Sequence, residues 1–166
     1  MPSRSFWNAP VVIVEKKIRG VSAASLTRFA GRAQRAAGLR GRVSILVTGS
    51  AELRRLNRRY RRKDKATDVL SFIADGARAS RPHLRMAGDI AISAQVAAEN
   101  ARRLGHSPAA EVKILILHGL LHLAGLDHDD ARDRGRMSRR EEKLRRRLGL
   151  PGALIRRSLP AARKRS

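Results

Sequence analysis

The segment "AEVKILILHGLLHLAG", residues 110–125, is the most hydrophobic stretch of the chain. Pro108 precedes it at an early helical position, where the missing N–H of proline costs little. Gly125 is the residue type that most often follows the last turn of a helix. Because its apolar residues occupy most sides of such a helix, the segment predicts a central helix around which the remaining elements pack.

The segments on either side predict strands and helices that follow one another in a regular order. Apolar and β-branched runs predict strands, and apolar residues at helical spacing predict helices. The predicted strands are residues 10–15, 42–48, 67–73 and 88–93, and the other predicted helices are residues 21–38, 51–60, 94–105 and 131–150. This order predicts one α+β domain with a mixed four-stranded sheet, helices mainly on one side and the His-bearing helix at the centre.

Capping residues and inner faces are predicted for two of these helices. Ser50 is the expected N-cap of the second helix, and Asp129 or Asp130 the expected N-cap of the last. The expected inner faces are Leu53, Leu56 and Tyr60 in the second helix, and Met137, Leu144 and Leu148 in the last.

The length of 166 residues fits a single domain, predicted at residues 1–152, followed by a basic tail at 153–166. The tail has no core pattern and is predicted to be disordered; a solubility role and an RNA-binding role both remain open. The N-terminus has too short an apolar run for a signal peptide, and no stretch reaches the roughly 20 apolar residues of a membrane span. A cytoplasmic location is expected.

The charge of the chain points to a polyanionic partner. Lysine and arginine number 37 against 14 acidic residues, which gives a formal net charge of +23. Nucleic acid is the favoured partner, and an anionic membrane surface is the alternative. With only five aromatic residues, contacts to phosphates are expected rather than stacking of bases. Because cysteine is absent, any metal must be held by histidine and carboxylate.

Three of the five histidines, His118, His122 and His128, fall within eleven residues. The first two are four residues apart, so their rings lie on the same face of a helix, and His128 can join them once Gly125 has ended it. Three neutral nitrogens can bind one zinc ion and leave a position open for water, as in catalytic sites. Nickel or copper would also bind, and buried core histidines are the alternative. Asp127 is read as a turn residue rather than as a partner of an imidazole.

The same histidine spacing occurs in the metzincin proteases, where a glutamate follows the first histidine and serves as general base. Here Gly119 occupies that position. Because glycine has no side chain to accept a proton, a metallopeptidase is disfavoured.

A second segment, "LNRRYRRKDKATDVLSF" at residues 56–72, completes a pattern with "GDIAIS" at 88–93 and "HGLLHLAGLDH" at 118–128. Together the three segments closely resemble the YbeY family of bacterial endoribonucleases, over about residues 10–150 and in the same order. The chain departs from the family at Ile73, where proline is frequent, and in an unusually basic loop at residues 74–86. These departures concern the substrate-binding backbone rather than the histidines.

The resemblance implies a single-strand-specific endoribonuclease with one zinc ion per chain. It implies action in 16S rRNA 3′-end maturation and ribosome quality control, on the small ribosomal subunit, with a small-subunit ribosomal protein and an assembly GTPase as possible partners. The implied zinc ligands are His118, His122 and His128, and the implied catalytic residues are Arg61 and His118. A non-catalytic rRNA-binding assembly factor with a structural zinc ion remains the alternative.

The chemistry of Arg61 agrees with that role, because a planar guanidinium can bind two phosphate oxygens at once. Neighbouring cations would extend a phosphate-binding groove, namely Arg59, Arg62, Lys63 and Lys65. Plain solvated charges are the favoured reading for Arg58 and Arg59. A turn held by local ion pairs is the alternative for residues 63–65, and Thr67 and Asp68 are expected to begin a strand.

Overall fold

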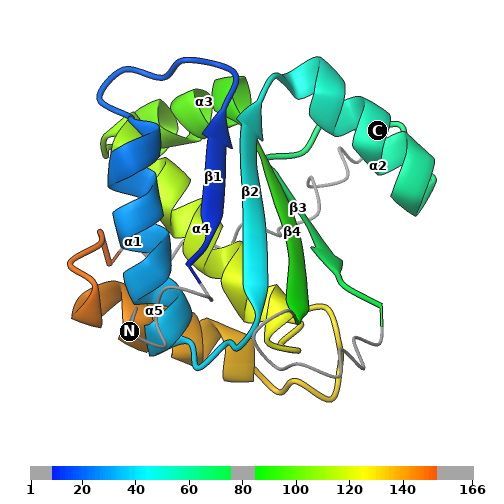
Figure 1. Cartoon of the computed structure of the whole chain (residues 1–166), viewed down its shortest axis with the longest axis vertical. Helices are drawn as coiled ribbons and strands as arrows, with labels where there is room; N and C mark the ends of the chain where they lie inside the picture. The colour runs from blue at the N-terminus through cyan, green and yellow to red at the C-terminus, as the bar shows by residue number, and fades with distance from the viewer. Residues whose placement is uncertain (1–8, 76–84, 153–166) are drawn as a thin grey trace, which may run out of the picture.

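The computed structural model describes residues 9–75 and 85–152, and in this part of the chain the helices and strands follow the predicted order (Figure 1). They are β1 (Val11–Val14), α1 (Ala23–Ala36), β2 (Arg42–Thr48), α2 (Ser50–Arg61), β3 (Val69–Ile73), β4 (Met86–Ser93), α3 (Ala94–Leu104), α4 (Pro108–Leu123) and α5 (Arg136–Arg147). The predicted tail at 153–166 lies outside the described residues, as does most of the basic loop at 74–86.

The four strands form one mixed sheet in the order β1-β2-β4-β3. β1, β2 and β4 run parallel, whereas β3 pairs antiparallel with β4 and forms one edge. The predicted α+β fold with a mixed four-stranded sheet is therefore confirmed. Because β3 is an edge strand, one side of its backbone remains accessible to side chains from α2.

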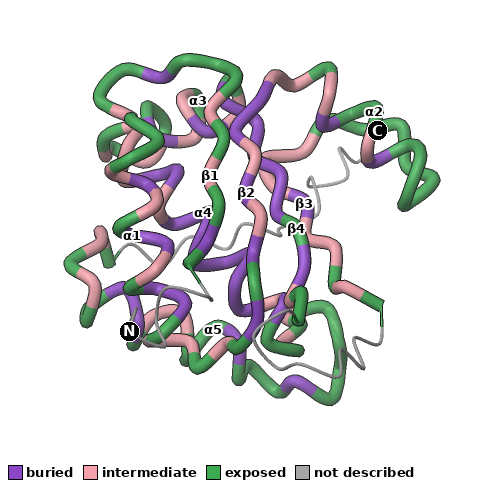
Figure 2. The backbone as a smooth tube through the Cα atoms, viewed as in Figure 1, coloured by how far each residue is buried: buried purple, intermediate pink, exposed green. Residues whose placement is uncertain are grey.

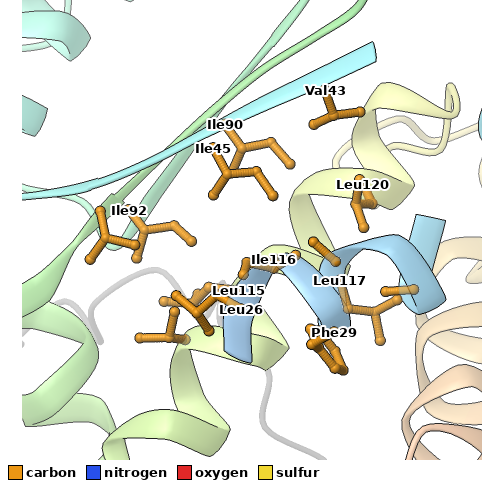
Figure 3. Close-up of a cluster of buried hydrophobic side chains, with 14 of the residues drawn as sticks. Leu26, Phe29, Val43, Ile45, Ile90, Ile92, Leu115, Ile116, Leu117 and Leu120 are labelled. Carbon is orange, nitrogen blue, oxygen red and sulfur yellow. The ribbon is translucent and has the colours of Figure 1, made fainter. Parts of the chain in front are cut away.

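Most of the helices pack on one face of the sheet, and α4 lies at the centre of the core (Figures 1 and 2). Figure 3 shows Leu115, Ile116 and Leu120 of α4 among side chains from β2, β4 and α1. The inward residues of β2 alternate along the strand, with Val43, Ile45 and Val47 buried. The opposite face is covered by α2 only over β3 and β4, where Leu53 meets Leu70 and Ala91. In the described part of the chain, no helix combines the length and apolar character that a membrane crossing requires.

Gly119 allows α4 to approach the sheet closely. A Cβ atom at this position would lie 2.8 Å from Cδ1 and 2.9 Å from Cγ2 of Ile90, well inside van der Waals contact. We therefore expect Gly119→Ala to lower the free energy of unfolding by about 1–3 kcal/mol, despite the better helix propensity of alanine. Urea denaturation measures the change.

Gly31, in the middle of α1, is the matched control. An added Cβ there would meet only Arg35 Nη1 at 3.5 Å and Pro10 Cδ at 3.9 Å, which are ordinary contacts. Gly31→Ala should be neutral or stabilise the protein by up to about 1 kcal/mol. Equal effects at the two glycines would contradict the close packing of α4 on β4.

Two expectations for α2 were wrong. Ser50 is the first helical residue rather than the N-cap, which is Gly49; the Ser50 hydroxyl lies 2.8 Å from the Ser93 hydroxyl instead. Tyr60 was expected on the inner face but is 59% exposed, because α2 extends beyond the sheet edge at its end. Its ring makes an edge contact with Phe72, with centroids 5.3 Å apart.

The last helix begins later than predicted, at Arg136. Asp130 does not cap it, because its carboxylate accepts a hydrogen bond from the N–H of Arg132 within the preceding turns. The N–H of Met137 is instead satisfied by the carboxylate of Asp133. The predicted inner face is confirmed at Met137 and Leu144, which are buried.

Candidate metal centre

The end of α4 brings the three predicted histidines together. His118 and His122 lie one turn apart, and α4 ends at Leu123. Gly125, with a φ of +91°, then turns the chain back so that His128 reaches the same place. One ring nitrogen from each histidine can be chosen so that all three lie within 4.8 Å of one another, and the two Nε2 atoms of His118 and His122 are 3.2 Å apart.

This arrangement fits a tetrahedral metal ion. Zinc binds imidazole nitrogen at about 2.0–2.1 Å, which places two tetrahedral ligands about 3.3 Å apart. The 3.2 Å between the nitrogens of His118 and His122 matches that spacing. His118 is buried and the other two rings are partly buried. Three histidines and no further protein ligand would leave one coordination position for a reactant.

The surroundings of His122 keep its imidazole neutral. Burial is the main cause that lowers the pKa of His122 to about 4, and the electrostatic influence of the neighbouring His118 and His128 acts in the same direction. At neutral pH its nitrogen lone pair is therefore available, because protons do not compete with a cation for it.

Glu141, on α5, is a residue of the site that the sequence interpretation missed. Its Oε2 lies 2.9 Å from Nδ1 of His118, and its Oε1 accepts a hydrogen bond of 2.5 Å from Nη2 of Arg145. Burial alone would raise the pKa of Glu141, but the hydrogen bond and electrostatic interaction with His118, with those of Arg145, lower it to about 2. An ionised carboxylate there holds the proton of His118 on Nδ1, so that the lone pair of Nε2 faces His122.

A sequence signal for Glu141 did exist. Met137, Glu141, Leu144 and Leu148 repeat at helical spacing, so the glutamate lies within the predicted apolar face of the last helix. A carboxylate on such a face is rarely buried without a charged or hydrogen-bonding partner. The signal indicated a buried partner but could not identify His118.

Arg61 is the last residue of α2 and lies near the edge strand β3. Its Nη2 donates a hydrogen bond of 3.2 Å to the carbonyl oxygen of Ser71 in β3. Its charge is also among those that lower the pKa of His122, although as the smallest cause. Arg61 is exposed to solvent and is hydrogen-bonded to the edge strand β3.

The loop after Arg61 is held by contacts to α2 and α3. Nδ2 of Asn57 donates to the carbonyl oxygen of Lys65 at 2.9 Å. Asp64 pairs with Arg54 at 2.6 Å rather than with its neighbours, which contradicts the alternative of a turn held by local ion pairs. Asp68 precedes β3 and accepts a hydrogen bond from Asn100 of α3. These contacts position the basic residues of the loop.

A pocket of about 460 Å³ opens between α2, this loop and α3. Its lining includes four cationic side chains, Arg61, Lys63, Lys65 and Arg103. Arg103 comes from α3 and was not anticipated, because nothing in its local sequence separates it from other surface arginines. Arg58 and Arg59 are solvated, as expected; Arg59 lies over the ring of Tyr60, 5.4 Å from its centroid.

The aspartate beside His128 has the predicted turn role. Oδ1 of Asp127 accepts a hydrogen bond of 3.0 Å from the N–H of Asp129. It therefore shapes the bend that delivers His128 to the site.

Comparison with known proteins relates the whole described domain to one family. Residues 11–149 match the family model "Endoribonuclease YbeY". A protein of that name from Koribacter versatilis is 55% identical over 156 residues, which cover 93% of this chain and 95% of the relative. Another, from Aquifex aeolicus, is 42% identical over 119 residues, 71% of this chain and 77% of the relative.

A solved structure has the same fold. The solution structure of TM1509 from Thermotoga maritima matches with a TM-score of 0.56 over 82% of this chain and 88% of that one. Its sequence is 22% identical, so the likeness concerns the fold alone.

Proposed function

Because the chain belongs to the YbeY family of endoribonucleases, we propose that it cuts single-stranded ribosomal RNA with the help of one bound zinc ion. The observation that carries the proposal is the group of three histidine nitrogens, together with the exposed Arg61 that is hydrogen-bonded to the edge strand β3. A metal centre can polarise a phosphoryl oxygen, and a phosphate-binding cation can stabilise the charge that develops during phosphodiester cleavage.

His118, His122 and His128 would hold the metal. When bound, the metal would act as a Lewis acid toward a phosphoryl oxygen. Arg61 and His118 are the catalytic residues of the proposal. Arg61 binds phosphate oxygens through its planar guanidinium and stabilises the charge that develops on them. Since Arg61 already donates to a fixed carbonyl of β3, its orientation needs little further ordering.

The pocket beside Arg61 would hold the adjoining nucleotides. Lys63, Lys65 and Arg103 provide charge, while the amides of Asn57 and Asn100 also line it. Its lining contains no aromatic ring, which favours phosphate contacts over base stacking. The substrate then runs along the open edge of β3.

We assign the activity to 16S rRNA 3′-end maturation and ribosome quality control in the cytoplasm. The small ribosomal subunit, one of its proteins and an assembly GTPase are the proposed partners. Family membership and the net charge of +23 support this setting.

A peptidase of the metzincin type has no support in the geometry. The general base of those enzymes would stand at position 119, where even a Cβ atom would collide with Ile90.

The test is cleavage of a single-stranded RNA by the metal-loaded protein, by the chelated protein and by Arg61→Lys and Arg61→Ala variants. We expect chelation to abolish cleavage and zinc to restore it. We expect Arg61→Ala to lower kcat about 10²–10³-fold and Arg61→Lys to recover only part of that loss, because an ammonium lacks the planar pair of donors. Cleavage that survives chelation, or that is equal in all variants, would reject the proposal.

A further inference from the structure

The outer side of α5 carries a row of basic residues that the metal centre does not use. Positions 136, 140, 143 and 147 follow helical spacing and are all arginine or lysine. Arg139 and Arg146 flank the row. Glu141 and Arg145, on the inner side of the same helix, are engaged with His118 and with each other.

Part of this row lines a groove of about 500 Å³ between α5 and the ends of α1 and α4. We call it the α5 groove; its lining is Ala37, Ala124, Leu126, Arg136, Arg139, Arg140 and Lys143. Its lining combines small and apolar side chains with four cations. No acidic side chain is among the residues that line it.

Two of the four cations are oriented by the backbone rather than neutralised. Nη2 of Arg140 donates to the carbonyl oxygen of Ala36, and Nη1 of Arg139 donates to that of Arg134. By contrast, two arginines of α2 are paired with carboxylates, Arg54 with Asp64 and Arg55 with Glu52. On α5, Glu142 lies 3.7 Å from Arg146, outside the groove.

From this geometry we propose that the α5 groove is a second RNA-binding surface, which holds the phosphodiester backbone of a long RNA away from the point of cleavage. The inference rests on the proposed function, because it takes RNA as the substrate. Guanidinium groups that have no acidic partner in the described part of the chain match phosphate oxygens. Contacts to phosphates carry no direct information about base sequence, so the binding is expected to be independent of it.

A lipid surface fits the groove less well. A helix that lies in a membrane interface inserts its apolar face, whereas Met137 and Leu144 of α5 are each 1% exposed and belong to the core. The large hydrophobic residues that are exposed among the described residues all lie outside α1, α4 and α5. The groove therefore offers charge without an insertable apolar surface.

The test compares two variants that each lose four positive charges. The groove variant is R136Q/R139Q/R140Q/K143Q, and the matched control is K16Q/K17Q/R19Q/R102Q, whose residues are exposed and line neither the groove nor the pocket beside Arg61. For a long single-stranded RNA, we expect the groove variant to bind about tenfold or more weakly at physiological salt. The slope of log affinity against log salt concentration should become less steep by about 3, because each of the four lost phosphate contacts contributes about 0.7 to it.

The control variant should keep the wild-type slope to within about 1, because scattered charges make no fixed phosphate contacts. Equal losses in the two variants would show a general charge effect and overturn the inference, as would unchanged binding by the groove variant. If the groove variant unfolds at a lower temperature than wild type, R136Q/K143Q takes its place, because it keeps both backbone hydrogen bonds of Arg139 and Arg140. The change in its salt slope should be about half as large as that of the groove variant.

A short oligonucleotide separates this inference from the proposed function. Wild type and groove variant should cut it at the same rate, because it reaches only the metal centre. A wild type that cuts neither substrate would contradict the proposed function, whereas a long RNA bound equally well by both proteins would contradict the α5 groove alone.

Discussion

Replacement of His118 by alanine should remove the bound metal and lower RNA cleavage by at least about a thousandfold. In the proposed site His118 supplies one of three ligand nitrogens and is the one that contacts the carboxylate of Glu141, so only two partly buried histidines would remain to hold the ion. Loss of Lewis-acid stabilisation worth several kcal/mol corresponds to a rate loss of that order. Elemental analysis of the purified variant and a cleavage assay measure the two effects.

His106 is the matched control for this variant, because it is a histidine outside the metal group whose side chain is also largely covered. Its Nε2 lies 2.5 Å from Oε2 of Glu111, which is fully buried. His106→Gln keeps a donor for that carboxylate and should retain the metal and the cleavage rate. Equal activity of His118→Ala and wild type would point to a contaminating nuclease.

The His118→Ala variant also distinguishes a catalytic metal from a structural one. A structural zinc ion contributes about 10–16 kcal/mol to folding in small zinc domains, so its loss unfolds them. Here α4 is anchored by a large apolar cluster that includes Leu115, Ile116 and Leu120. We therefore expect His118→Ala to retain a cooperative thermal transition. Complete unfolding on metal loss would favour the non-catalytic assembly factor.

The sequence predicted the parts of the site that depend on local spacing. His118 and His122 share a helical face because they are four residues apart, and Gly125 makes the bend toward His128. The central position of α4 followed from its apolar composition, which left no polar face to present to water. In these cases the information lies within a few turns of one segment.

The parts that were missed depend on packing between distant segments. Glu141 reaches His118 only because α5 packs against α4, and Arg103 reaches the pocket only because α3 lies beside the loop after α2. Tyr60 fits an apolar pattern, yet α2 extends past the sheet edge (Figure 1), so the residue remains 59% exposed. A single sequence does not show which residue such a side chain will meet.

Neutralising Glu141 should weaken metal binding by about 10–100-fold, because the partner that orients a ligand histidine affects metal affinity to that degree. Glu141→Gln keeps the shape of the side chain and an acceptor for Arg145 but removes the charge that holds the proton on Nδ1 of His118. Glu141→Ala should cost more, since it also leaves the buried Arg145 without this carboxylate.

The neighbouring Glu142 is the control, since it lies on the same helix but pairs with Arg146 at the surface. Glu142→Gln should bind metal as wild type does. Competition with a chelating dye measures affinity, and the absorption spectrum of the Co²⁺-loaded protein reports the ligand geometry, which a loss of helix packing alone would not change. Unaltered affinity and spectrum in Glu141→Gln would mean that the carboxylate only fastens α5 to α4. A weaker site with unchanged melting temperature would instead make Glu141 the residue that orients His118 toward the metal.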